Sequence, residues 1–233
     1  DMMDTRIEQL RNSSGEADTH GLSNELVDSF LKIDPNLNVA LDLAIKAREN
    51  LDDEVEDLLL KLTESQFASE LQKDFVNFYE PSTVNPYIPL AAKGPWIITT
   101  HGAVVHDNGG YGMLGMGHDP TEVMSSMSES HVMANVMTPS VTHKRFADTL
   151  KREVGHTRGT CPFDRFICMN SGSESVTVAM RISDINARLM TDQDGPHHGK
   201  EIWTVALDSG FHGRTDRPAS ISSSCLPKYQ KKL

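Results

Sequence analysis

The stretch from Arg165 to Met180, "RFICMNSGSESVTVAM", decides the fold, because its hydrophobic pattern changes in the middle. The run "RFICM" predicts a short buried strand, and "EIWTVALD" at 201–208 predicts a second strand. Between them, "ESVTVAMRISDINARLM" predicts a helix with one apolar face, formed by Val178, Ile182, Ile185 and Leu189. Strand, helix and strand in this order predict a βαβ unit and therefore an α/β fold with a mainly parallel sheet.

The polar cluster "NSGSES" lies between the first predicted strand and the helix. Ser171 and Glu174 have the spacing of a capping box, and Gly172 lets the backbone come close to a ligand. Backbone amides at a helix start favour an anion, above all a phosphate, to which Ser173 adds a hydroxyl. Ordinary helix capping by Ser171 is the plainer interpretation of the same residues.

A second loop, "SGFHGRT" at 209–215, follows the second predicted strand. Because the carboxyl ends of parallel strands lie at one edge of a sheet, we expect the two loops to lie together. Phe211 is suited to cover a flat heteroaromatic ring, and Arg214 to hold a carboxylate. A phosphate site beside such a pair suits pyridoxal phosphate and an amino acid.

The chain resembles the class III aminotransferases, also called ω-aminotransferases, which are fold type I pyridoxal-phosphate enzymes. "NSGSES" is similar to the family's N-S/T-G-x-E-A helix start, and "FHGRT" is similar to its F/Y-H-G-R-T motif. "DNGGYGMLGMGH" at 107–118 is similar to a glycine-rich region of the family. The resemblance covers about Asn85 to Leu233 and implies the first part of the family's large domain.

The resemblance also implies roles for individual residues. Gly172 and Ser173 match the phosphate-binding pair, and Phe211 matches the aromatic residue that stacks on the cofactor ring. The cofactor site that we expect consists of Ser171, Gly172, Ser173, Phe211 and His212, where His212 serves either packing or catalysis. The expected substrate contacts are Arg214, Tyr111 and Tyr87.

Two features depart from the family pattern. "GHDP" has one residue between His118 and the next proline, where the family usually has two. The family's covalent cofactor lysine and the acidic partner of the pyridine nitrogen lie well downstream of "FHGRT", so no catalytic residue is assigned, and we do not give that role to Lys228, Lys231 or Lys232. We therefore expect the chain to be an incomplete fragment that is inactive alone.

The implied activity of the intact protein is transfer of an amino group from an amino acid or ω-amine to a 2-oxo acid. The resemblance further implies a homodimer with active sites at the interface. Racemases, aminomutases and decarboxylases with the same cofactor remain alternatives, as does a non-catalytic fragment or scaffold relative.

Composition restricts the classes of partner. The chain has 233 residues, 38% of them hydrophobic, with a net charge of -11 and a pI near 5.3. This charge gives no electrostatic basis for binding nucleic acid or anionic lipid, and no apolar run predicts a membrane span or a signal peptide. We expect a location in the cytoplasm or an organelle lumen, with Cys161, Cys168 and Cys225 as reduced thiols.

The sequence divides into three segments. Residues 1–80 predict an acidic helical extension, whose "DDEVED" run is a solvated helix start, and prolines mark a boundary near Pro81. Residues 81–118 predict an extended crossing, a hairpin around His101-Gly102 and a glycine-rich loop. Residues 119–233 begin with two helices, one from Pro120 with methionines as core filler and one ending at Gly155, and continue into the cofactor-binding part.

Three other kinds of site fit the sequence less well. "GYGMLG" at 110–115 satisfies the dinucleotide-binding pattern, but a further glycine and a proline follow where a helix is needed. His101, His106 and His118 lack the usual spacing of zinc ligands and have no nearby cysteine, so we expect no metal site. "SGSES" does not provide the nucleophile motif of a serine hydrolase.

Overall fold

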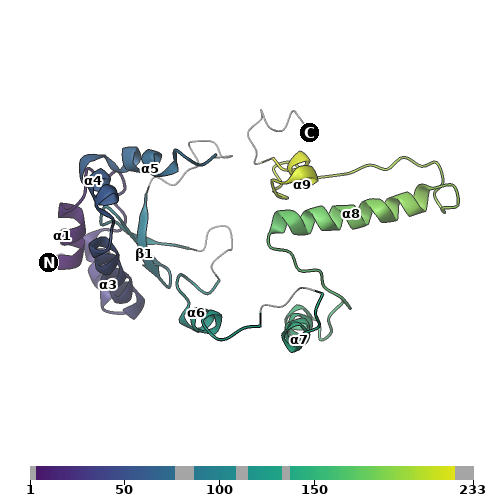
Figure 1. The fold of residues 1–233 in the computed structure, drawn as a ribbon, viewed down its shortest axis with the longest axis horizontal. Helices are drawn as coiled ribbons and strands as arrows, with labels where there is room; N and C mark the ends of the chain where they lie inside the picture. Colours follow the sequence, from purple (N-terminus) through teal and green to yellow (C-terminus); the bar gives the residue numbers. More distant parts are fainter. Residues whose placement is uncertain (1–3, 77–86, 109–114, 133–136, 224–233) are drawn as a thin grey trace. The chain divides into compact units, whose positions relative to one another are not determined.

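The structure, a computed structural model, describes residues 4–76, 87–108, 115–132 and 137–223 (Figure 1). Two compact units can be distinguished. The first combines Asp1–Asn77 with Ser82–His131, and the second combines Phe78–Pro81 with Val132–Leu233. The predicted boundary residue Pro81 lies outside the described residues, but the predicted hairpin belongs to the same unit as the N-terminal helices.

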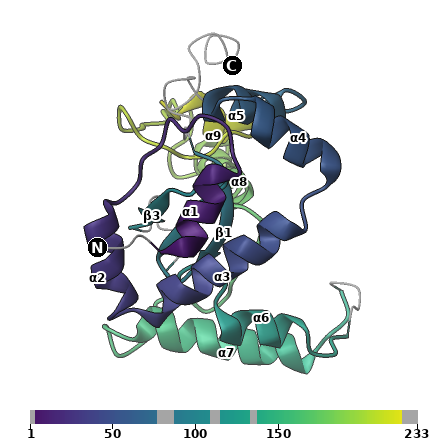
Figure 2. The same ribbon diagram turned by 90° about the vertical axis from the view of Figure 1, so that its left-hand side faces the viewer.

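The first unit contains helices around a small sheet, as the view onto α1 and α3 in Figure 2 shows. The helices are α1 (Thr5–Asn12), α2 (Asn24–Leu31), α3 (Pro35–Glu49), α4 (Asp53–Lys61), α5 (Glu64–Gln72) and α6 (Thr121–Met127). The strands are β1 (Pro89–Lys93), β2 (Trp96–Thr99) and β3 (Val104–His106). The predicted helical character of the N-terminal region is thereby confirmed.

Side-chain caps explain where several of these helices begin. Asp34 accepts a hydrogen bond from the Asn36 amide at 2.9 Å, and Pro35 occupies the first turn of α3, where a missing N–H costs nothing. Thr63 and Gln66 form a reciprocal capping box at the start of α5. The boundaries of α3 and α5 are therefore set locally by their sequence.

The sheet is antiparallel with the order β1-β2-β3. Trp96 pairs with His106 and Ile98 with Val104, so the chain turns back over Thr100–Ala103, as predicted for the hairpin around His101-Gly102. All four residues of β2 are buried, which fits a central strand made of apolar and β-branched residues. This hairpin is the part of the fold that the sequence predicted most accurately.

Helix α3 packs on the sheet and supplies much of the core. Trp96 is almost fully buried, its ring lies 5.0 Å from that of Phe30, and its indole nitrogen donates to Asp34 at 2.8 Å. The buried core cluster is Ile7, Leu10, Val27, Leu37, Ala40, Leu41, Ala44, Trp96, Ile98 and Val104. The N-terminal helices and the hairpin therefore fold around one shared core.

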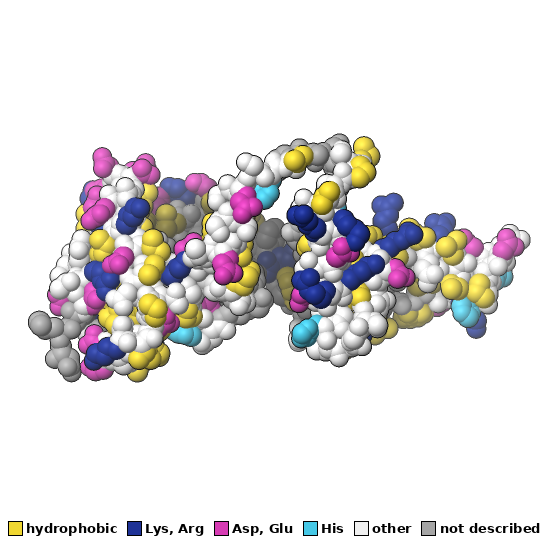
Figure 3. Space-filling view, turned by 90° about the horizontal axis from the view of Figure 1, so that it is seen from below, with side chains coloured by type: hydrophobic (Ala, Val, Ile, Leu, Met, Phe, Trp, Pro, Cys, Tyr) yellow, Lys and Arg dark blue, Asp and Glu magenta, His cyan; other side chains and the backbone are white. Residues whose placement is uncertain are grey.

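The second unit contains three helices among its described residues: α7 (Val141–Gly155), α8 (Gly172–Thr191) and α9 (Asp216–Ser220). The predicted helices ending at Gly155 and carrying "ESVTVAM" are both present. Figure 3 shows exposed Lys and Arg side chains gathered over α7, where Lys144 pairs with Asp148 and Arg152 with Glu153. The acidic overall charge is therefore unevenly distributed, although these pairs balance part of the basic surface.

The predicted parallel strands are not formed among the described residues. Residues 165–169 and 201–208 have no strand assignment, and Figure 1 draws the latter as a coil that returns toward the start of α8. A strand is defined by hydrogen bonds to a neighbouring strand, and the sheet of the described residues contains only the three antiparallel strands β1, β2 and β3 of the other unit. Val205 is 90% exposed and Trp203 80% exposed, so apolar residues expected inside a sheet face solvent.

Two further expectations differ from the structure. The methionines of α6 were predicted to fill a core, but Met124 and Met127 are exposed, because this short helix buries none of its residues. Similarly, the apolar face of α8 is present but uncovered, with Ile182, Ile185 and Leu189 exposed. In the described part of the chain, no helix is long and apolar enough to cross a membrane.

Candidate functional site

The first turn of α8 presents backbone amides next to open space. Ser171 caps the helix: its Oγ accepts from the Glu174 amide at 3.2 Å, and its hydroxyl lies 3.3 Å from the Glu174 carboxylate. The first backbone bond within the turn comes from the Ser175 amide to the Ser171 carbonyl, so the amides of Gly172 and Ser173 precede the intrahelical ladder. A Cβ on Gly172 would meet no described atom within 4 Å.

The loop "FHGRT" packs directly on this turn. The Arg214 amide donates to the Oγ of Ser173 at 3.2 Å, which ties the loop to the helix start. Gly213 makes the approach possible: it has a φ of 119°, and a Cβ there would lie 2.6 Å from the same Oγ. The structure thus brings together the two loops that the sequence predicted to be neighbours, without the parallel strands on which that prediction rested.

Ser222 holds the loop from its other side. This buried residue accepts a hydrogen bond from the His212 amide at 2.8 Å through its Oγ. The same hydroxyl lies 2.9 Å from the Gly213 carbonyl and 2.8 Å from the Pro218 carbonyl. A single side chain therefore fixes the backbone on both sides of the His212–Gly213 peptide.

Helix α9 anchors the end of the loop to α8. Arg217 forms an ion pair with Asp184, and the hydroxyls of Thr177 and Thr215 lie 3.3 Å apart. Both contacts join the segment after "FHGRT" to α8, so the loop is attached to the helix at more than its first turn.

Phe211 and Arg214 lie next to each other within the loop. The guanidinium carbon of Arg214 is 5.4 Å from the centroid of the Phe211 ring, which is a cation–π distance. Phe211 is 60% exposed, and Arg214 is partly buried. The arrangement combines an accessible aromatic surface with a positive charge, as a ligand with a flat ring and an anionic group would require.

His212 is turned into its own loop. Its Nε2 is buried without a hydrogen-bond partner among the described residues, and a Cβ on Gly210 would lie 2.9 Å from that nitrogen. This close contact favours the packing role among the two that the sequence left open for His212.

The structure thus places the predicted cofactor residues in one region of the second unit, together with Arg214. Tyr87 lies in the other unit, just before β1. Tyr111, Lys228, Lys231 and Lys232 lie outside the described residues. No group of three His, Cys, Asp or Glu side chains in the described ranges is placed to hold a metal ion.

Sequence reasoning missed Ser222, Thr215 and the Asp184–Arg217 pair. These residues position the loop through backbone contacts, and Ser222 occurs in a run of serines in which nothing marks one position as special. The spacing of Asp184 on α8 gave no indication of a partner in α9, because that contact depends on how the chain returns to the helix.

Comparison with known families now adds to this geometry. The family model described as Aminotransferase class-III matches residues 78–232. The chain belongs to the class III aminotransferase family. The match includes both "NSGSES" and "FHGRT" of this aminotransferase family member, and the family typically uses pyridoxal phosphate. No similar curated protein and no similar solved structure was found.

Proposed function

We propose that the intact protein is a pyridoxal-phosphate-dependent aminotransferase that moves an amino group from an amino acid or ω-amine to a 2-oxo acid. The observation that supports this most directly is the hydrogen bond from the Arg214 amide to the Ser173 Oγ. It joins the segment "NSGSES" to the segment "FHGRT" in a chain whose sequence matches that family.

The residues at the start of α8 fit the phosphate of this cofactor. The amides of Gly172 and Ser173 lie at the positive end of a 20-residue helix, and the space beside Gly172 is open. The Ser173 hydroxyl, which accepts from Arg214, retains its proton for donation to a phosphate oxygen. Phosphate binding by these groups would be a charge-assisted interaction, at about 1.5–3 kcal/mol for each hydrogen bond.

The loop residues would serve the rest of the cofactor and the substrate. Phe211 offers its ring to the pyridine ring, and Arg214 offers its guanidinium to a carboxylate. Ser222 fixes the loop backbone between these two residues through the His212 amide and the Gly213 carbonyl. When bound, pyridoxal phosphate supplies the electron sink that allows bonds at the amino carbon to break.

Several features of this proposal rest on the sequence pattern and on the family. We propose a cytoplasmic homodimer, for which the exposed apolar face of α8 offers a surface that a partner would cover. A substrate role for Tyr87 and Tyr111, the segment boundary near Pro81 and the parallel sheet are proposals of the same kind. No lysine is assigned as the covalent attachment point of the cofactor.

Binding of pyridoxal phosphate to the full chain tests the cofactor assignment. In Gly172→Leu, the new side chain enters open space, so the fold should persist while the phosphate loses access to the amides. We expect this variant to bind pyridoxal phosphate at least about tenfold more weakly, since one charged hydrogen bond is worth about that factor. Affinity for pyridoxal, which lacks the phosphate, should not change.

The matched control is Ala179→Leu, which introduces the same side chain at an exposed position later in α8. Equal pyridoxal-phosphate affinity in Gly172→Leu and this control would contradict the phosphate site. Activity is tested separately in the intact protein by following transfer from a panel of amino acids and amines to 2-oxoglutarate. Cofactor binding without any transfer would favour the scaffold alternative.

A further inference from the structure

Glu174 is the acidic residue in the first turn of α8, and its side chain is held at the start of that helix. The Ser171 hydroxyl donates to the Glu174 carboxylate at 3.3 Å, while the Ser171 Oγ accepts from the Glu174 amide at 3.2 Å. These two contacts keep a negative charge beside Gly172 and Ser173, whose amides begin the helix.

The charge of Glu174 is not balanced by a basic side chain in the described part of the chain. Among the described residues, no ion pair includes Glu174, whereas Asp184 on the same helix pairs with Arg217. The Glu174 side chain is also half-buried, so water screens its charge less than it would screen a fully exposed one. The carboxylate therefore acts on any other charge that comes to the helix start.

A bound phosphate and Glu174 would share the positive end of α8. A helix start favours a carboxylate in its first turn for the same reason that it favours a phosphate. A phosphate bound by the amides of Gly172 and Ser173 would lie within about one helical turn of the Glu174 charge. The amides and the Ser173 hydroxyl would attract this phosphate, and the Glu174 carboxylate would repel it.

The structural and the electrostatic effects of Glu174 can be separated by one substitution. A capping box takes either Glu or Gln at this position, because both side chains carry the oxygen that accepts the hydrogen bond. In Glu174→Gln, the bond from the Ser171 hydroxyl can therefore persist while the negative charge is lost. The helix start should keep its conformation in this variant.

We infer that Glu174 lowers the affinity of the α8 start for the cofactor phosphate by electrostatic repulsion. The inference rests on the proposed function, which assigns the phosphate to this helix start. Glu174 would then determine how tightly the cofactor is held without itself donating a hydrogen bond to it. Ser173, whose hydroxyl proton is not used by a carboxylate, remains the serine that donates to the phosphate.

Titration of the full chain with pyridoxal phosphate at low ionic strength tests this inference. We expect Glu174→Gln to bind about five- to tenfold more tightly than the wild type, which is the effect of one unit charge on a phosphate dianion across one helical turn in water. The control Glu201→Gln removes the same charge from an exposed position outside α8 and should leave the affinity unchanged. Equal affinity in the wild type and Glu174→Gln, or equal gains in the two variants, would overturn the inference.

Two further measurements distinguish repulsion from a change in structure. Pyridoxal, which lacks the phosphate, should bind equally to the wild type and to Glu174→Gln. Salt screens charges, so at about 1 M salt the difference between the two chains for pyridoxal phosphate should fall below about twofold. A gain of the same size for pyridoxal, or a gain that persists in salt, would assign the effect to the conformation of the helix start and overturn the inference.

Failure of the proposed function gives a different pattern. If neither the wild type nor Glu174→Gln binds pyridoxal phosphate, the cofactor assignment is overturned, and the inference with it. If both bind it with equal affinity, the cofactor assignment stands and the inference alone is overturned. Binding to Glu174→Gln at concentrations too low for the wild type supports both.

Discussion

The Oγ of Ser173 lies 3.2 Å from the amide nitrogen of Arg214, which follows it by 41 positions. This hydrogen bond joins the first turn of α8 to the loop that returns to it. A ligand held by the amides of that turn therefore lies beside a loop whose own position depends on the helix. Changes that detach the loop are expected to affect both stability and cofactor binding.

Gly213→Ala should detach the loop from α8. The φ of 119° is unfavourable for alanine, and the new Cβ would lie 2.6 Å from the Ser173 Oγ. We expect the free energy of unfolding to fall by about 1–3 kcal/mol and the affinity for pyridoxal phosphate to fall with it. Urea unfolding and cofactor titration measure the two effects.

Gly159→Ala is the matched control for this change. Gly159 also has a positive φ, of 77°, but no described atom lies within 4 Å of the position that a Cβ would take there. Gly159→Ala therefore has the same unfavourable backbone conformation without a steric clash. It should leave the affinity for pyridoxal phosphate unchanged. Equal losses of cofactor affinity in the two variants would show that the contact with Ser173 is unimportant.

Ser222→Ala should loosen the same loop from its other side. The change removes the acceptor of the part-buried His212 amide and leaves that donor unsatisfied, which costs about 1–3 kcal/mol. Ser220→Ala removes an exposed hydroxyl bonded to the Arg217 carbonyl and should cost less than about 0.5 kcal/mol. Thermal unfolding compares them, and a loss as small as in Ser220→Ala would argue against the role of Ser222.

The sequence predicted those parts of the fold that are governed by local rules. The cap at Ser171 and the turn around His101-Gly102 depend on residues close in the chain, so spacing and residue type were sufficient to find them. The helix carrying Val178 and Ile182 was likewise predicted from its period. The presence of an apolar face on this helix, however, does not identify the segment that packs against it.

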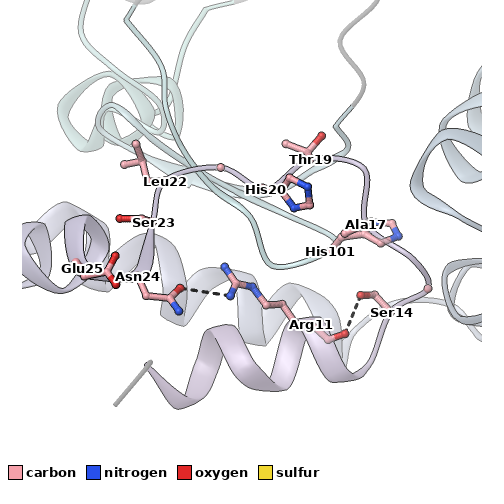
Figure 4. A pocket seen from close by; sticks show the side chains of 12 residues that line it. Arg11, Ser14, Ala17, Thr19, His20, Leu22, Ser23, Asn24, Glu25 and His101 are labelled. Atoms are coloured by element: carbon pink, nitrogen blue, oxygen red, sulfur yellow. Dashed lines mark hydrogen bonds between the residues drawn. The ribbon is translucent and has the colours of Figure 1, made fainter. Parts of the chain in front are cut away.

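The features that the sequence did not predict, and the predicted features that the structure does not show, concern contacts between distant residues. "RFICM" and "EIWTVALD" have the composition of strands, but a strand exists only when a neighbour is hydrogen-bonded to it. The position of Ser222 and the pairing of Asp184 with Arg217 depend on the path of the chain back to α8. The pocket lined by Arg11, His20 and His101 was missed for the same reason, because its walls come from α1, the loop between α1 and α2, the start of α2 and the hairpin turn (Figure 4).

His101 should make the first unit sensitive to mild acid. The residue is 1% exposed, and burial lowers the pKa of its ring, although Glu64 and Asp18 act in the opposite direction. The unfolded chain takes up a proton near the ordinary value of about 6.5, while the folded chain resists it. The free energy of unfolding is therefore expected to fall as the pH drops below about 6.5. Above that pH, His101 should contribute no pH dependence.

Urea unfolding between about pH 5 and 7.5 measures this dependence, with a slope of at most about 1.4 kcal/mol per pH unit for one proton. The pKa of the Asp4 carboxyl is lowered by its hydrogen bond with Arg6, and that of Asp34 is lowered because hydrogen bonds outweigh the effect of burial. Both carboxyls therefore lose their contributions at lower pH, outside this window. His101→Gln should flatten the curve over the window. An equally steep curve in that variant would assign the sensitivity to other groups.

Asp34→Ala tests the link between α3 and the sheet, since the Asp34 carboxylate accepts one hydrogen bond from each of them. One carboxylate oxygen caps α3 through the Asn36 amide, and the other accepts from the buried indole of Trp96 at 2.8 Å. Loss of a cap costs about 0.5–2 kcal/mol, and an unsatisfied buried donor costs about 1–3 kcal/mol, so the combined loss should exceed that of either alone. Asp52→Ala is the control, because Asp52 occupies the same position before α4 without a side-chain capping bond and should cost little. Urea unfolding followed by helical circular dichroism compares the variants, and similar midpoints would mean that the indole finds another acceptor.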